Sequence, residues 1–183
     1  GYDGVGIHYY TPNFSGFQAA VSYIPNGDSD GANDGYYKQA AGVDGDNIWS
    51  VGANYTAEME GFRVSASGGY SDADGSDMEA WSLGLELGTA GFTVAAHFED
   101  NAGADAGQDL AVGASYATGP WTATIGYSTL LDAPTGGDID TFAGWVTYAL
   151  APGVKAAAGI EHSSRDGALE DSTAGLAYLN LSF

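Results

Sequence analysis

The most constraining feature of this chain is an alternation of apolar and small polar side chains with a period of two residues. In an extended strand, successive side chains point to opposite faces, so this period predicts strands with one apolar and one polar face. One segment, for example, places Trp121, Ala123, Ile125 and Tyr127 in one phase and Thr122, Thr124, Gly126 and Ser128 in the other. Helical periodicity does not appear over any useful length. Eleven such segments begin close to the following residues: Val5, Phe17, Ile48, Phe62, Ala80, Phe92, Leu110, Trp121, Thr141, Val154 and Ser172.

The connections between these segments alternate between short and long. The short ones contain Gly, Pro or Asn, which supply the backbone angles that tight hairpins need. They lie at residues 11–16, 58–61, 89–91, 118–120 and 151–153, and the longer loops lie at about 25–47, 71–79, 99–109, 129–140 and 161–171. Short turns at one end and long loops at the other are typical of membrane barrels. The sequence therefore predicts an all-β fold, a transmembrane antiparallel up-and-down barrel.

Charge is concentrated in the predicted loops. The chain has 24 Asp plus Glu against 4 Lys plus Arg, a formal net charge of −20. All the acidic residues except Asp3, Glu58, Glu60 and Glu86 fall in the five long loops. Nucleic acid is excluded as a partner because its phosphates require clustered cations. The absence of Cys excludes disulfides and thiolate metal sites.

Aromatic residues lie at both ends of the apolar phase, and smaller residues lie between them. The pairs are Phe17 and Tyr23, Trp49 and Tyr55, Phe62 and Tyr70, Phe92 and Phe98, Trp121 and Tyr127, and Phe142 and Tyr148. Two levels of amphipathic rings match the aromatic girdles of a lipid-facing band. The alternative is a soluble β-sandwich or barrel with these rings inside, but a packed core would be bulky in the middle of the stripe. Such a protein would also dissolve without detergent.

Three stretches resemble general outer-membrane porins of alphaproteobacteria, of the Rhodobacter type: residues 6–23, 49–55 and 176–183. The series Gly175, Ala177, Leu179, Leu181 and Phe183 also resembles the C-terminal signature by which outer-membrane barrels are recognised for assembly. The resemblance implies a sixteen-stranded homotrimer in the bacterial outer membrane, contacting lipid and lipopolysaccharide. It also implies passive diffusion of ions and small hydrophilic solutes, with no cofactor required.

Eleven is an odd number of strands, whereas bacterial single-chain barrels have an even number. We therefore expect residues 1–183 to form one barrel domain, the C-terminal portion of a sixteen-stranded barrel. Its N-terminal strands and inward-folded constriction loop are then expected to lie upstream of Gly1. A miscount by one, giving a complete ten- or twelve-stranded barrel, is the alternative. A smaller complete barrel of this kind would be a binding or adhesion protein that acts through its acidic external loops.

The candidate functional residues are pore-lining rather than catalytic. His8, His97 and His162 have no metal-ligand spacing, and no nucleophile with a base and an orienting group is apparent, so no enzyme is predicted. Arg63, Lys155, Glu86 and His97 fall in the polar phase and are predicted to face the lumen. The resemblance implies a basic cluster on the channel wall, to which Arg63 is the better match and Lys155 the weaker. Alternatively, both cations are merely solvated wall residues.

The acidic loops could bind Ca²⁺, which prefers carboxylate and carbonyl oxygens. Asp72, Asp74, Asp77 and Glu79 form the densest group, and Asp28, Asp30, Asp34, Asp44 and Asp46 form a looser one. Neither group has the spacing of an EF-hand loop, and solvated surface charge is the alternative. Acidic loops at a channel mouth also raise the local cation concentration. The sequence therefore predicts a mild cation preference.

Overall fold

The structure, a computed structural model, describes residues 6–26, 46–74, 79–102, 107–131, 137–166 and 171–182. These residues form a single sheet of eleven strands, and the described part contains no helix long and apolar enough to cross a membrane. The strands are β1 (Ile7–Tyr10), β2 (Phe17–Asn26), β3 (Asp46–Met59), β4 (Phe62–Asp74), β5 (Glu79–Thr89), β6 (Phe92–Asn101), β7 (Gly107–Thr118), β8 (Trp121–Leu131), β9 (Ile139–Ala151), β10 (Val154–Arg165) and β11 (Ser172–Leu181).

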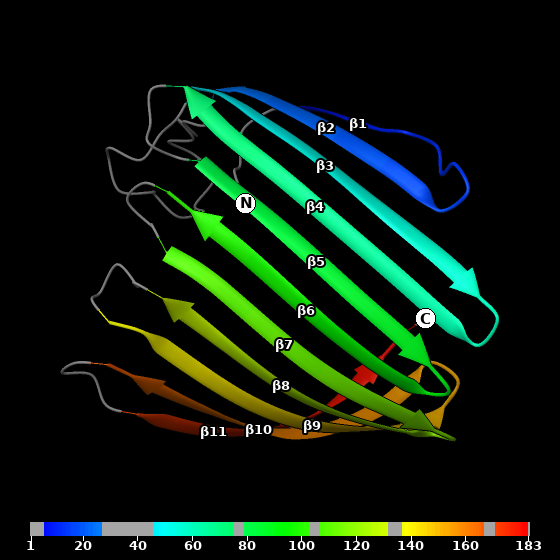
Figure 1. Ribbon diagram of the computed structural model, residues 1–183. Helices are drawn as coiled ribbons and strands as arrows, with labels where there is room; N and C mark the ends of the chain where they lie inside the picture. Colours follow the sequence, from blue (N-terminus) through cyan, green and yellow to red (C-terminus); the bar gives the residue numbers. More distant parts are fainter. Residues whose placement is uncertain are drawn as a thin grey trace.

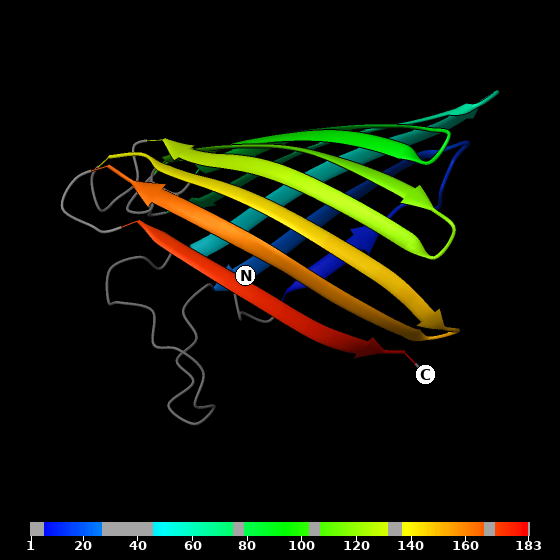
Figure 2. The same ribbon diagram turned by 90° about the horizontal axis from the view of Figure 1, so that it is seen from below.

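The strands are ordered in the sheet as they are in the chain, and every neighbouring pair is antiparallel. Figures 1 and 2 show that the sheet curves strongly, with its concave side facing the interior of a trough. β1 and β11 are its two edges, and within the described residues each pairs with one neighbour. The predicted all-β, up-and-down arrangement of eleven strands is confirmed.

Hairpins at the short-turn end are closed by two-residue loops. Ser15 and Gly16 both have positive φ, and so do Ala90 and Gly91. Positive φ at both central residues is the conformation of a type I′ turn, whose twist matches that of the two strands it joins. Gly16 cannot be replaced without strain, because a Cβ there would collide with the carbonyl oxygen of Thr56. Gly16 and Gly91, which helped to predict these turns, therefore occupy positions that favour glycine.

The strands extend further toward the long loops than the sequence predicts. Residues 71–74 and 79 were expected in a loop but belong to β4 and β5, and Asp72 pairs with Glu79 across the two strands. Likewise, Glu99 and Asp100 belong to β6. Charged side chains do not interrupt a strand beyond the apolar band, because the ladder hydrogen bonds are made by the backbone. The predicted boundaries of these long loops were therefore wrong.

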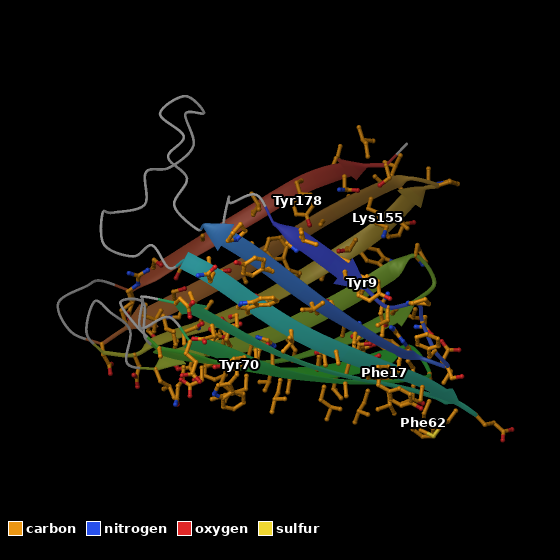
Figure 3. The ribbon with its side chains drawn as sticks, turned by 90° about the horizontal axis from the view of Figure 1, so that it is seen from above. Tyr9, Phe17, Phe62, Tyr70, Lys155 and Tyr178 are labelled. Carbon is orange, nitrogen blue, oxygen red and sulfur yellow. The ribbon has the colours of Figure 1, made fainter. Side chains whose placement is uncertain are left out.

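The convex face carries the apolar phase and is exposed. Phe62 is 58% and Ile125 67% exposed, and Figure 3 shows Phe17, Phe62 and Tyr70 projecting away from the trough. Among the described residues, the buried hydrophobic cluster consists of Ile24, Ile48 and Ala73, near the long-loop end. A soluble sandwich would bury its large aromatics, which this single sheet does not do.

The aromatic residues form two rows of contacts on this convex face. At the long-loop end, Tyr23 contacts Trp49 with ring centroids 4.3 Å apart, and Tyr127 contacts Phe142 at 4.7 Å. At the short-turn end, the corresponding pairs are Phe92 with Tyr116 at 4.3 Å and Trp121 with Tyr148 at 4.5 Å. Tyrosine hydroxyls at the long-loop end donate hydrogen bonds to polar groups beyond the band: Tyr23 to Asn47, Tyr70 to Glu79 and Tyr127 to Asp140. The predicted girdle pairs therefore share one face.

Candidate functional site

The candidate site is the concave face of the sheet, lined by the polar phase of each strand. The register aligns Ser65 of β4 with Glu86 of β5, and Glu86 with Ala95 of β6, so this phase forms continuous rows across the trough. Hydroxyl groups on this face pair between strands, as in the contacts between Thr56 and Ser65 at 3.0 Å. Small polar side chains leave the trough open instead of filling it.

Arg63 and Glu86 are brought together on this face. The Arg63 Nη1 atom lies 3.2 Å from Glu86 Oε1, an ion pair between β4 and β5. Both side chains are well exposed to solvent, so the pair contributes little to stability. Its effect on the site is electrostatic, because the carboxylate offsets the charge of the cation beside it.

His97 lies two strands away from Arg63 on the same face. Its Nε2 atom is 3.6 Å from Glu99 Oε2, and both residues belong to β6. His97 lies opposite Gly84 of β5, so no side chain covers it from that strand. The imidazole is therefore held beside a carboxylate and open to the trough.

Lys155 lies far from the other three residues, on β10. It is opposite Asn180 of β11 and Ala149 of β9, and within the described residues it forms no ion pair. All four residues predicted to line a pore thus lie on the concave face, but they form no single cluster. Arg63, Glu86 and His97 gather on β4 to β6, and Lys155 lies across the trough.

The concave face also carries carboxylates that were not predicted from the sequence to line a pore. Their face follows from the strand register. Glu58 pairs with Arg63, and Asp109 pairs with Glu99. Glu161 lies an even number of residues from Lys155 on β10 and so shares its face. In the described part of the strands, these carboxylates and Glu86 outnumber the cations of the same face: Arg63, Lys155 and Arg165. The strand phase identifies them once the strands are known to extend beyond the apolar band.

Three of the four residues of the predicted calcium group lie on adjacent strand ends. Asp72 and Glu79 are cross-strand partners, and Asp74 accepts a hydrogen bond of 3.2 Å from the Asn47 side chain. Asp77 lies outside the described residues, as does most of the looser acidic group. Among the described residues, no three His, Asp or Glu side chains are grouped so that they could hold a metal ion. Calcium binding therefore stays a prediction.

The histidines do not form a catalytic arrangement. His162 Nδ1 is 2.8 Å from Thr173 Oγ1 on the convex face, whereas Ser163 contacts Thr141 at 2.9 Å on the concave face. The adjacent His162 and Ser163 therefore point to opposite sides of the sheet. His8 Nδ1 lies 2.7 Å from Ser22 Oγ on β2. His8 and His162 each pair with a hydroxyl, and among the contacts of the described residues neither imidazole has a third group that orients it.

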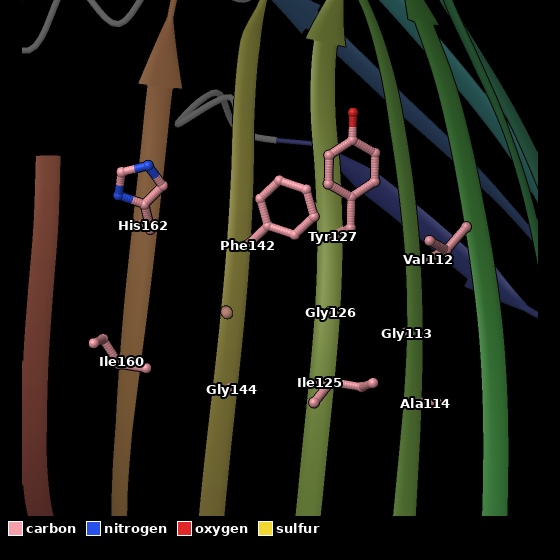
Figure 4. Close-up of a pocket in the computed structure, with 11 residues that line it drawn as sticks. Val112, Gly113, Ala114, Ile125, Gly126, Tyr127, Phe142, Gly144, Ile160 and His162 are labelled. Carbon is pink, nitrogen blue, oxygen red and sulfur yellow. The ribbon is translucent and has the colours of Figure 1, made fainter. Parts of the chain in front are cut away.

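A hollow of about 620 Å³ lies on the convex face, between β7 and β10. Figure 4 shows Ile125 and Ile160 on either side of Gly144, with Tyr127, Phe142 and His162 at the end toward the long loops. A Cβ added at Gly144 would meet no atom within 4 Å, which explains the depth of the hollow. Because its lining is almost entirely apolar, this hollow is part of the apolar face and not of the polar site.

Comparison with known proteins places the fold. The family model of the Gram-negative porins matches residues 1–168. A triple mutant of the Rhodopseudomonas blastica porin is similar at a TM-score of 0.69 and 19% identity, covering 97% of this chain and 55% of that one. An anion-selective porin from Comamonas acidovorans is similar at a TM-score of 0.70 and 15% identity, covering 97% and 59%. No curated protein matches. This chain thus spans a little over half the length of the porins it resembles.

Proposed function

The chain belongs to the Gram-negative porin family, a non-enzymatic family of the outer membrane, and from this premise we propose that it forms the wall of a water-filled channel. The channel lets ions and small hydrophilic solutes diffuse passively across the outer membrane. The observation that carries the proposal is the division of one sheet into an exposed apolar convex face and a small, polar concave face. No energy source or cofactor enters the proposal.

Channel width supports this proposal. The eleven strands are part of a sixteen-stranded porin barrel, and the match covers 55% of the length of the porin chain. Barrels of 16–18 strands leave an aqueous channel, whereas eight strands are filled by side chains. In hydrocarbon, every backbone N–H and C=O needs a partner, so the edges β1 and β11 must be paired when the sheet lies in a membrane. We therefore propose that this sheet is part of a closed barrel, in a homotrimer as is typical of the family.

We further propose a mild cation preference. The fold alone does not set the sign of selectivity, since the Comamonas protein of the same fold is anion-selective. The sign must then come from the wall residues, and carboxylates outnumber cations on the described concave face. Arg63 is offset by Glu86 at 3.2 Å, and the other cations of the described wall lie at opposite ends of β10: Lys155 beside the short turn and Arg165 toward the long loops. A negative wall concentrates cations at the channel.

Reversal potentials in a salt gradient across planar bilayers test both proposals. Stepwise current levels that close in threes support a trimeric channel, and a potential of the cation-selective sign supports the negative wall. Glu86→Gln should reduce the cation preference by removing the partner of Arg63, and Arg63→Gln should increase it. An absence of current steps would overturn the channel, and an anion-selective potential would overturn the preference alone.

A further inference from the structure

On the concave face, a group of large apolar side chains on β9 and β11 departs from the mostly small and polar lining. The group consists of Trp145 on β9 with Leu176 and Tyr178 on β11, and we call it the aromatic shelf. The Trp145 and Tyr178 ring centroids are 6.2 Å apart with an interplanar angle of 59°. Leu176 is 59% and Tyr178 48% exposed, and Figure 3 labels Tyr178 on the strand that borders the trough. Exposed apolar groups on a water-facing wall indicate a contact surface.

A glycine on the intervening strand makes this arrangement possible. Gly159 of β10 pairs with both Trp145 and Leu176, so it lies between the two strands that carry the shelf. A Cβ at Gly159 would collide with the Cδ2 and Cε3 atoms of Trp145. The indole therefore lies over the backbone of β10 and toward β11, against the wall, instead of projecting across the trough.

The position of Trp145 is unusual among the tryptophans of the chain. The chain has four, and Trp49, Trp81 and Trp121 all belong to the convex phase, each beside another aromatic ring. Trp145 alone occupies the opposite phase, since it pairs with Thr124, and Thr124 lies between Ala123 and Ile125 of the convex phase. Girdle packing in the membrane therefore accounts for three tryptophans but not for Trp145.

Polar groups surround the aromatic shelf. Thr124 is opposite Trp145, Asn180 lies two residues from Tyr178 on β11, and Glu161 lies two residues from Gly159 on β10. Hydroxyl, amide and carboxylate groups beside an exposed ring suit an uncharged, hydroxylated ring that has one flat apolar side. The excess of carboxylates on the same wall disfavours anionic aromatic solutes.

We propose that the aromatic shelf is a weak binding site for sugars in the pyranose form, whose flat side packs on the Trp145 ring with Tyr178 at its edge while the ring hydroxyls meet the polar groups around it. This inference rests on the proposed channel function and adds the solute class that the wall favours. The C–H groups on the flat side of a pyranose are apolar, and burying them against an aromatic ring is favourable. Loss of the indole should therefore weaken sugar binding roughly tenfold, because a sugar covers one face of the ring and so buries about half of its apolar surface.

Acrylamide quenching of tryptophan fluorescence tests the shelf in the full chain reconstituted in lipid vesicles. A disaccharide of two pyranoses should protect part of the emission from acrylamide, and an acyclic hexitol at the same total concentration of hydroxyl groups should not. Trp145→Leu should remove that protected component, whereas Trp121→Leu on the convex face should keep it. Gly159→Ala, which displaces the indole, should also abolish the protection. The same disaccharide should reduce single-channel current, with a midpoint roughly tenfold higher in Trp145→Leu.

The outcomes separate the shelf from the channel. Current steps that respond equally to the disaccharide and the hexitol would overturn the shelf and leave the channel standing. Disaccharide protection of Trp145 without any current would support the shelf and overturn the channel. A Trp145 that acrylamide cannot reach would show that another part of the protein covers the shelf, and would also overturn the proposal.

Discussion

The two faces of this sheet are built by the same strands, yet they differ in every property except backbone geometry. On β8, Ile125 is 67% exposed on the convex face, while its neighbours Thr124 and Gly126 lie on the concave face. A soluble protein would hide the apolar phase in a core, but here the buried hydrophobic cluster of the described residues is three small or medium side chains. This difference indicates that the convex face is suited to hydrocarbon and the concave face to water.

The largest effect should come from placing a charge on the convex face. Ile125→Arg puts a guanidinium between the two aromatic rows, at a cost of about 2–4 kcal/mol for a charge at the bilayer midplane. Thr124→Arg places the same group on the adjacent residue, facing the trough, and should cost well under half as much. Urea titration of the folded protein in lipid vesicles measures both. Equal destabilisation by the two variants would show that the two faces do not meet different solvents.

A smaller effect should separate two glycines on neighbouring strands. Gly144 on the convex face has open space where a Cβ would lie, whereas a Cβ at Gly159 on the concave face would meet the Trp145 ring. Gly144→Ala should be nearly neutral, and Gly159→Ala should cost about 1–3 kcal/mol, as overpacking does. The same urea titrations measure the difference. A Gly144→Ala variant as unstable as Gly159→Ala would show that the convex hollow is filled by a packed neighbour.

The smallest effect concerns aromatic pairs on the two faces. Trp121 and Tyr148 lie at 4.5 Å on the convex face, and Trp145 and Tyr178 lie at 6.2 Å on the concave face. Double-mutant cycles to Leu should give a coupling of about 0.5–1.5 kcal/mol for the convex pair and a smaller one for the concave pair. A larger coupling in the concave pair would mean that the aromatic shelf is a structural contact and not a surface open to solute.

Much of this fold was predictable because lipid on one face and water on the other favour apolar and polar side chains alternately along each strand. The eleven strands, the side of each girdle aromatic and the concave placement of Arg63, Lys155, Glu86 and His97 follow from strand phase alone. The turns were predictable because Gly16 and Gly91 take positive φ. Period and turn chemistry are local properties, so a single sequence carries them.

Features that depend on register between strands were not predictable. The pairing of Arg63 with Glu86 requires the offset between β4 and β5, which no local pattern fixes. The extent of the strands was underestimated because acidic residues such as Asp72 and Glu99 indicate loops in a soluble protein, while here the ladder continues past the apolar band. The phase of Trp145 follows from the sequence, but the position of its ring over Gly159 of the next strand does not.

Alternate residues of one strand are proposed to face lipid and water, and a cysteine scan of β8 can check this position by position. The chain has no Cys, so single substitutions from Thr122 to Ser128 can be labelled one at a time in vesicles. Positions 122, 124 and 126 should react with a water-soluble maleimide, and labels at 123, 125 and 127 should be quenched by nitroxide lipids. Reaction independent of phase, or a compact form in plain buffer that shields Ile125, would contradict the claim.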